Sequence, residues 1–213
     1  ESFLKKVDSD FNTMVGSAGE LFSIRTSLFE PQEEDTLLDD FMISMDVLTK
    51  RYKVQYEPKA RASEFASTSL SDEYQRKTRI AAGGFQSFFR SLHLLNPMRF
   101  GWVSFQLSFH RFARWIIAPL LLVSAFIANI FLVNISVFYL LIFALQTIFH
   151  SAALLALVLS IKGIKSKYLY IPFYFDFMHF CIFIGGFRYF LKLQKVTWEK
   201  AERHQEEIHL DMT

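Results

Sequence analysis

The sequence predicts a cytosolic α/β segment, then an amphipathic helix at the membrane surface, and then two or three transmembrane helices. Three patterns indicate this architecture. Helix-type and strand-type spacings of apolar residues alternate before residue 97, aromatic residues recur at helical spacing in 97–114, and no Asp, Glu, Lys or Arg occurs from Trp115 to Ile161. A charged side chain at the bilayer centre costs about 2.5–3.5 kcal/mol and one span takes about 20 residues, so the uncharged run predicts two spans folded back on each other.

Composition separates the two parts of the chain. Hydrophobic residues make up 52% of the sequence, with 25 Phe among them, and the excess lies after residue 114. The charges of residues 1–114 balance, with 15 basic and 15 acidic side chains. A net charge of +2 without a concentrated basic face argues against a nucleic-acid partner. The single Cys181 excludes an internal disulfide, and the charged, non-Met start at Glu1 leads us to expect further residues upstream.

The first part, residues 1–96, alternates element types. Apolar spacing and acidic residues in the first turn predict a helix over Asp39–Lys50. Lys53–Glu57 alternates apolar and polar residues and stops at Pro58, which is typical of a strand, and Ala60–Phe65 is interpreted as another. Ser69–Leu95 follows a helical pattern that we expect to break at Gly83-Gly84.

Residues 97–114 form the predicted interfacial helix. Arg111 and Arg114 are opposed by five aromatic residues, as expected of a helix lying at a membrane surface: Trp102, Phe105, Phe109, Phe112 and Trp115. We interpret both arginines as contacts to lipid phosphates. Basic residues accumulate before the first span while acidic residues stop at Glu73, so the positive-inside rule places the N-terminal part in the cytoplasm.

The membrane domain is predicted at 115–191, with spans at about 115–133, 136–161 and 170–191, followed by a polar tail at 192–213. The third segment contains Asp176, His179, Arg188 and a Gly185-Gly186 pair. A full span would send the basic tail outside, whereas a re-entrant hairpin broken at the glycines would keep it inside. The pattern slightly favours the full span. Asp176 is expected to pair with Arg188 or with backbone, and His150 to be a packed, hydrogen-bonded histidine.

Four features of the cytosolic part follow one another in an order that carries chemistry. They are a Gly-Ser turn (Gly16-Ser17-Ala18-Gly19), an acidic pair (Asp39-Asp40), the segment Tyr56-Glu57-Pro58, and the basic cluster Arg76-Lys77-Thr78-Arg79. Singly, each is explained by capping, turn formation or a solvated surface. In this order, and followed by a surface helix and spans, they resemble the C-terminal half of a family 2 membrane-bound glycosyltransferase similar to cellulose, hyaluronan and poly-N-acetylglucosamine synthases.

The resemblance runs from about residue 10 to residue 203 and implies roles for particular residues. Val15–Arg25 resembles the family's Gly-Ser segment, so Gly16 and Ser17 are expected to shape the acceptor site. Leu38-Asp39-Asp40 resembles the Thr-Glu-Asp motif, which makes Asp40 the catalytic base with Asp39 beside it. Arg76–Ile80 stands where the family has Gln-x-x-Arg-Trp, which implies that Arg76 and Arg79 bind substrate, Arg79 at the leaving diphosphate. Val196–Lys200 resembles the segment after the last membrane element.

The resemblance also implies partners, a cofactor and a place in the cell. It predicts an inverting hexosyltransferase in the bacterial inner membrane, with a nucleotide-sugar donor, a polysaccharide or lipid-linked acceptor, and lipids around it. A divalent metal, Mg²⁺ or Mn²⁺, is expected for the complete enzyme. Asp8-Ser9-Asp10 lies too close to Gly16 to be the family's Asp-x-Asp metal motif, so no metal ligands are evident and the chain alone is predicted to be inactive. Ile80 in place of the family's Trp, and Arg76 in place of its Gln, count against processive synthesis.

Two other function classes stay open from the residues themselves. One is a non-catalytic membrane scaffold that docks a partner subunit. The other is a small transporter component, suggested by Asp176 and His179 in the last apolar segment.

Overall fold

The computed structural model describes residues 2–17, 19, 21–63, 69–164 and 166–196. Within these ranges the chain forms helices and irregular segments and no strand, so the predicted α/β fold class, with its partial glycosyltransferase A-type domain, is wrong. In chain order the elements are α1 (Ser2–Phe11), η1 (Thr26–Leu28), α2 (Asp39–Thr49), α3 (Leu70–Arg90), η2 (Leu92–Leu95), α4 (Pro97–Phe100), α5 (Trp102–Gln106), the π-helical η3 (Leu107–Ile117), α6 (Ala118–Leu132), α7 (Val137–Ile161) and α8 (Lys167–Phe190).

The segment predicted as the first strand has no regular secondary structure. Val54 and Tyr56 are half-buried while Lys53, Gln55 and Glu57 are exposed, so burial follows the alternation in the sequence. Two of its backbone N–H groups, however, donate to side chains. The N–H of Val54 donates to Thr13 Oγ1 (2.8 Å) and that of Tyr56 donates to Ser9 Oγ (2.9 Å). The Val54 carbonyl accepts from the N–H of Met14 (2.8 Å), and the Glu57 carbonyl accepts from the N–H of Ala60 (3.1 Å) within a turn. A ladder needs repeated backbone pairs, which this segment does not make. The second predicted strand runs into 64–68, outside the described residues.

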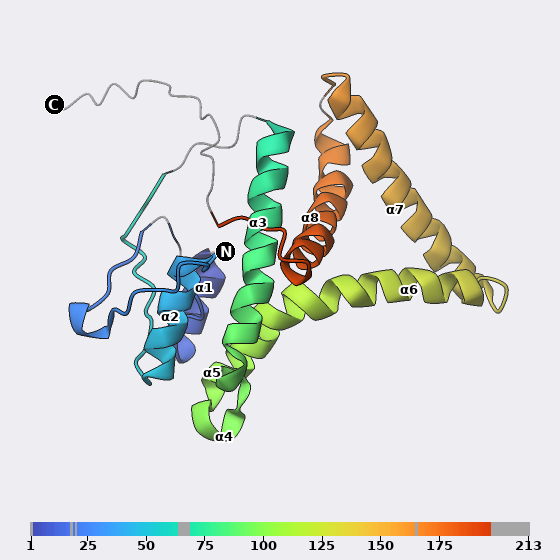
Figure 1. Cartoon of the computed structure of the whole chain (residues 1–213). Helices are drawn as coiled ribbons and strands as arrows, with labels where there is room; N and C mark the ends of the chain where they lie inside the picture. The colour runs from blue at the N-terminus through green and yellow to red at the C-terminus, as the bar shows by residue number, and fades with distance from the viewer. Residues whose placement is uncertain (1, 18, 20, 64–68, 165, 197–213) are drawn as a thin grey trace.

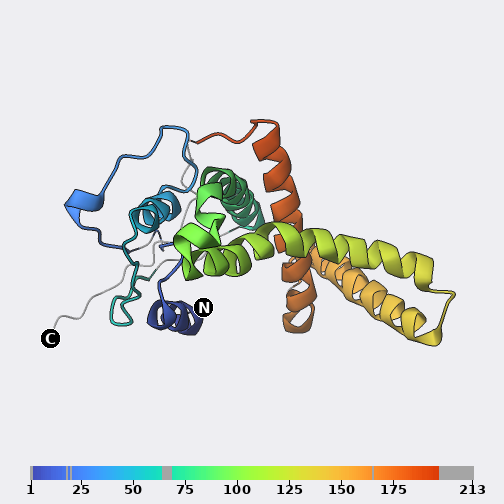
Figure 2. The same cartoon turned by 90° about the horizontal axis from the view of Figure 1, so that it is seen from below.

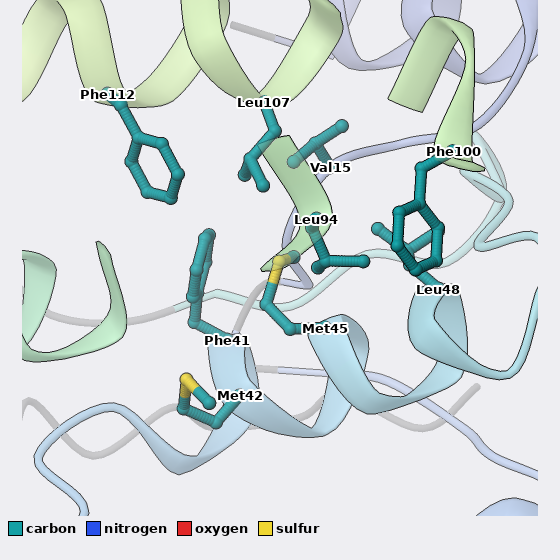
Figure 3. Packing of buried hydrophobic residues seen from close by; sticks show 9 residues of the cluster. All are labelled: Val15, Phe41, Met42, Met45, Leu48, Leu94, Phe100, Leu107 and Phe112. Carbon is teal, nitrogen blue, oxygen red and sulfur yellow. The ribbon is translucent and has the colours of Figure 1, made fainter. Parts of the chain in front are cut away.

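The helix predicted from Asp39 is confirmed as α2, and its apolar face forms the centre of the core. Four of its residues (Phe41, Met42, Met45 and Leu48) join Val15, Leu94, Phe100, Leu107 and Phe112 in one buried cluster. Figure 3 shows the helix that carries Leu107 and Phe112 lying over α2. Burying a side chain of this size contributes about 1.5–3 kcal/mol to the stability of the fold. This cluster therefore holds the helix over Trp102–Leu132, called the membrane-entry helix below, against α2.

Helix α3 runs straight through Gly83-Gly84, contrary to the predicted break. The glycines serve close packing instead. A Cβ on Gly83 would lie 2.5 Å from Leu38 Cγ, and one on Gly84 would lie 2.8 Å from the Trp115 ring. Ser69 caps the helix by accepting from the N–H of Asp72 (3.1 Å). A glycine costs about 1 kcal/mol in a helix, which the contact with its neighbours offsets here.

The helix that leads into the membrane extends without a break from Trp102 to Leu132. Its 31 residues correspond to about 46 Å at 1.5 Å per residue, more than a hydrocarbon core of about 30 Å. Its aromatic residues do not share one face as predicted. Trp102, Phe105 and Phe109 are exposed, but Phe112 is buried, because the π-helical turns from Leu107 onwards depart from the α-helical spacing.

Among the residues that the structure describes, three helices are long and apolar enough to span a membrane, which indicates a membrane protein. They are Trp102–Leu132, α7 and α8. The first two form a hairpin through 133–136, with Asn129 Nδ2 donating to Gln146 Oε1 (2.8 Å) across it. The third helix, α8, continues through Gly185-Gly186 without a break. Which parts of these helices lie in hydrocarbon, and hence the predicted span boundaries, stays a prediction.

Helix α8 lies along α3, and α7 leads back to it from the far end of α6 (Figures 1 and 2). The two helices approach closely where Gly185 faces α3. A Cβ there would lie 2.5 Å from Ala81 Cβ and 2.7 Å from the Thr78 carbonyl oxygen. Stacked rings extend the contact, with Tyr74 on Phe180 and Phe89 on Tyr189. Helix α3 thus joins the core around α2 to the membrane domain.

Candidate functional site

The Gly-Ser turn closes directly on the N-terminal end of α2. Ser17 Oγ donates to the Asp40 carbonyl (2.5 Å), and the Ser17 N–H donates to Ser44 Oγ (3.2 Å) one turn further along α2. Gly19 lies against the Asp40 carboxylate, since a Cβ at Gly19 would be 3.0 Å from Asp40 Oδ2. The structure therefore brings Gly16, Ser17 and Asp40 together in one place.

Gly16 is required there for two reasons. Its φ is +92°, a left-handed conformation that favours glycine. A Cβ would also meet the Phe41 ring at 2.7 Å. The turn can approach α2 this closely only because no side chain stands between them.

The two candidate acids begin α2. Asp39 and Asp40 occupy its first turn, where their carboxylates lie beside N–H groups that have no partner within the helix. Asp39 is exposed, whereas Asp40 is half-buried under the turn. Of the pair, Asp40 is the one whose surroundings are shaped by the rest of the chain.

One stripe of α3 packs against the segment that leads into these acids. Gln86 accepts from the N–H of Leu37 (2.8 Å) and donates to the carbonyl of Asp35 (2.8 Å). Arg90 donates to Thr36 Oγ1 (2.9 Å) and forms an ion pair with Asp35 (2.6 Å). This bond to the guanidinium lowers the pKa of the Asp35 carboxyl below its ordinary value.

Arg79 extends this stripe by one turn. Positions 79, 83, 86 and 90 are spaced four, three and four residues apart, and therefore share one face of a helix. Gly83, on the same stripe, touches Leu38, the residue before Asp39. This register carries Arg79 towards the side of α3 that faces the start of α2.

Arg76 lies three residues before Arg79 and seven before Gly83, so it shares their side of α3, and Lys77 follows it. Arg76 forms a two-point contact with Glu73 (both 3.1 Å), and Lys77 approaches the same carboxylate at 3.6 Å. Both cations are thus engaged with an acid four or fewer residues away. A role for Arg76 in binding substrate remains a prediction.

A half-open cleft of about 1500 Å³ borders the Gly-Ser turn. It extends between α1, the 21–28 segment, α2 and the 52–63 segment, and Ser17 and Ser44 line it beside Arg25 and Lys53. Asp40 and Arg79 do not line it. The turn therefore separates this cleft from the acidic end of α2.

The sequence of this chain matches a known protein family over most of its length. Residues 3–185 match the sequence model described as Glycosyl transferase family group 2. The chain belongs to this family. The match includes the Gly-Ser turn, Asp39-Asp40 and the basic cluster of α3, and it supports a glycosyltransferase-type enzyme. Comparisons with curated proteins and with solved structures find no match.

The metal expected of such a glycosyltransferase finds no ligand set here. No group of three or more His, Cys, Asp or Glu side chains comes together in the part of the chain that the structure describes. Asp8, in the Asp-Ser-Asp sequence, bonds to His110 Nδ1 (3.0 Å) instead. We therefore assign no metal ligand and derive no step through a metal.

The sequence interpretation missed two contacts. Arg111, interpreted as a lipid-phosphate contact, donates from Nε to the Val15 carbonyl (2.9 Å) behind the Gly-Ser turn. Asp176 does not pair with Arg188 but accepts from His150 Nδ1 (2.9 Å), which confirms the expected hydrogen bond of that histidine. No sequence spacing signals either contact, because the partners are 96 and 26 residues apart.

Proposed function

We propose that this chain is the acceptor-side part of an inverting glycosyltransferase similar to cellulose, hyaluronan and poly-N-acetylglucosamine synthases. The complete enzyme transfers a hexose from a nucleotide-sugar donor to a polysaccharide or lipid-linked acceptor at the cytoplasmic face of the bacterial inner membrane. The observation that carries the proposal is the Gly16-Ser17 turn closed on Asp40, with Ser17 Oγ 2.5 Å from the Asp40 carbonyl.

In the proposed reaction the Asp40 carboxylate is the general base. It takes the proton from the acceptor hydroxyl as that oxygen bonds to the anomeric carbon of the donor sugar. The bond from the same carbon to the nucleoside diphosphate breaks, and the diphosphate leaves with the bonding electrons. Asp39 lies beside the base at the start of α2 and is exposed enough to contact substrate.

The diphosphate gains negative charge as it leaves, and a guanidinium stabilises such charge well. Arg79 is proposed for this role because it lies on the stripe of α3 that packs against the start of α2. Arg76 is a weaker candidate, since it must first leave Glu73. Gly16 and Ser17 shape the acceptor side through their contact with α2.

The donor and its divalent metal need groups that the described residues do not assemble. We therefore propose that the chain alone does not transfer sugar, and that the complete enzyme binds the nucleotide and Mg²⁺ or Mn²⁺ with residues other than those described.

The test is Asp40→Asn in the complete membrane protein. Sugar incorporation from a panel of labelled nucleotide sugars should fall by at least about 100-fold, the scale of a positioned base, while membrane insertion is unchanged. The matched control is Asp39→Asn, which should retain more activity because that side chain is not held by the turn. Full activity of Asp40→Asn would refute the assignment.

Asp40→Asn and a further variant, Asp176→Asn, separate the two other function classes. A scaffold would keep its assembly and phenotype with Asp40→Asn. A transporter component would instead be damaged by Asp176→Asn, and the His150–Asp176 bond between α7 and α8 is the observation that favours testing it. For the glycosyltransferase we expect Asp176→Asn to retain sugar transfer.

A further inference from the structure

Arg111 lies on the helix that enters the membrane, yet three of its contacts are with the candidate site. Its Nε donates to the carbonyl of Val15, 2.9 Å away and directly before Gly16. Its guanidinium lies 5.8 Å from the centre of the ring of Phe41, which follows Asp40 in the sequence. One terminal nitrogen would be 3.2 Å from a Cβ built on Gly16. The side chain thus touches the turn and the start of α2 together.

Neighbouring residues of the same helix support this arrangement. Gln106 Nε2 donates to the Thr13 carbonyl (3.0 Å), and Trp115 packs on Phe41 with ring centres 5.6 Å apart. One face of the helix therefore follows the 13–17 segment and continues onto α2. Arg114, one turn from Arg111, is exposed.

We propose that Arg111 is a positioning residue that holds the Gly16-Ser17 turn on the N-terminal end of α2, and so fixes Asp40, from the membrane-entry helix. The inference rests on the proposed role of Asp40 as the base. Arg111 acts through two contacts of different kinds, a charge-assisted hydrogen bond to a carbonyl and a cation–π contact with a ring. Neither requires substrate, so the turn is held before the acceptor arrives.

The physical consequence is a link between membrane insertion and assembly of the site. Gly16 and Ser17 belong to no helix, and Ser17 donates two hydrogen bonds to α2. Arg111 attaches the preceding residue, Val15, to a helix that continues into the bilayer. A shift of the base by about 1 Å can cost about 100-fold in rate, so this attachment bears on turnover.

The experiment compares Arg111→Gln, Arg111→Lys and the matched control Arg114→Gln in the complete protein, reconstituted in nanodiscs of phosphatidylcholine with or without phosphatidylglycerol. Hydrogen exchange at the Ser17 amide should accelerate by about 10-fold or more in Arg111→Gln and stay unchanged in Arg114→Gln, since only the former loses the turn's attachment. Arg111→Lys keeps the cation and a donor, and should give intermediate exchange.

Turnover gives a second, independent measurement. In Arg111→Gln we expect kcat to fall by about 10- to 100-fold with the donor KM within about 2-fold, because the base moves while donor contacts do not. Arg111→Lys should recover part of kcat. A general loss of folding would instead change KM and the exchange of amides throughout α2 and α3.

Three results would overturn the proposal. One is equal behaviour of Arg111→Gln and Arg114→Gln. Another is an Arg111→Gln defect that appears only with phosphatidylglycerol, which would assign Arg111 to a lipid phosphate. The third is faster Ser17 exchange with unchanged kcat. Should Asp40→Asn remain fully active, the proposed function fails, while the Ser17 exchange still reports whether Arg111 holds the turn.

Discussion

Gly185 offers a test in which two physical effects have opposite sign. In an isolated helix Gly185→Ala stabilises by about 0.8–1.0 kcal/mol, because alanine loses less backbone entropy on folding. In this protein the added Cβ would lie 2.5 Å from Ala81 Cβ, 2.7 Å from the Thr78 carbonyl oxygen and 2.8 Å from the Ala82 nitrogen. Two of these three atoms belong to the backbone of α3 and cannot rotate away.

Overpacking of this kind costs about 1–3 kcal/mol, and rigid neighbours place it at the upper end. Subtracting the helix-propensity gain leaves a net loss of about 1–2 kcal/mol. For a domain of this size that corresponds to a melting temperature lower by roughly 2–8 °C. Thermal unfolding in a mild detergent, followed by circular dichroism, measures the change.

The adjacent glycine is the matched control. At Gly186 the three atoms nearest to the added Cβ all belong to the Phe85 ring, the first at 2.9 Å, and a side chain can turn aside where a backbone cannot. Gly186→Ala should therefore be close to neutral. A Gly185→Ala protein as stable as its parent would show that α3 and α8 do not approach as closely as described, and equal losses at both positions would point to the same conclusion.

Three further changes test other contacts. Gln86→Ala removes two hydrogen bonds to the segment before α2 and leaves the buried N–H of Leu37 without its acceptor. The free energy of unfolding measured in urea titrations should therefore fall by about 1–3 kcal/mol. No change would contradict the packing of α3 against this segment. Arg90→Gln should lower the free energy of unfolding by under about 1 kcal/mol at pH 7, because Asp35 is exposed. Arg90 lowers the pKa of Asp35 from 3.8, so this loss of stability should shrink as the pH falls below that value. A loss that grows in acid would refute the pairing. Replacing both His150 and Asp176 by Leu should destabilise by less than the sum of the two single replacements, with a coupling of about 1 kcal/mol in a double-mutant cycle. Strictly additive losses would show that the two do not interact.

The sequence predicted the local features well where one short-range rule decided them. Acidic residues in a first turn and helical spacing gave α2 its start at Asp39, and the absence of charge predicted the long helices on both sides of residue 135. The alternation at 53–57 agrees with the partial burial of Val54 and Tyr56, but the strand predicted from it does not form. A strand needs a neighbour, and alternation within one segment carries no information about whether that neighbour exists.

The errors come from contacts between distant parts of the chain. Gly83-Gly84 and Gly185-Gly186 have the low helix propensity of a break, but each pair lies where another helix or an indole ring approaches closely. Propensity alone cannot distinguish these cases, because the compensating contact is tertiary. The contact of Arg111 with the Val15 carbonyl was missed for the same reason, since an arginine before a span has the same sequence signature whether or not it also meets a carbonyl 96 residues away.

The continuity of the helix from Trp102 to Leu132 has a mechanical consequence. A hydrophobic stretch adapts to a thicker or thinner bilayer largely by changing its tilt. Arg111, the tenth residue of this helix, holds the Val15 carbonyl, so we expect a change in tilt to move the Gly16-Ser17 turn relative to α2. The acyl-chain length of the surrounding lipid should then affect how the turn lies on Asp40.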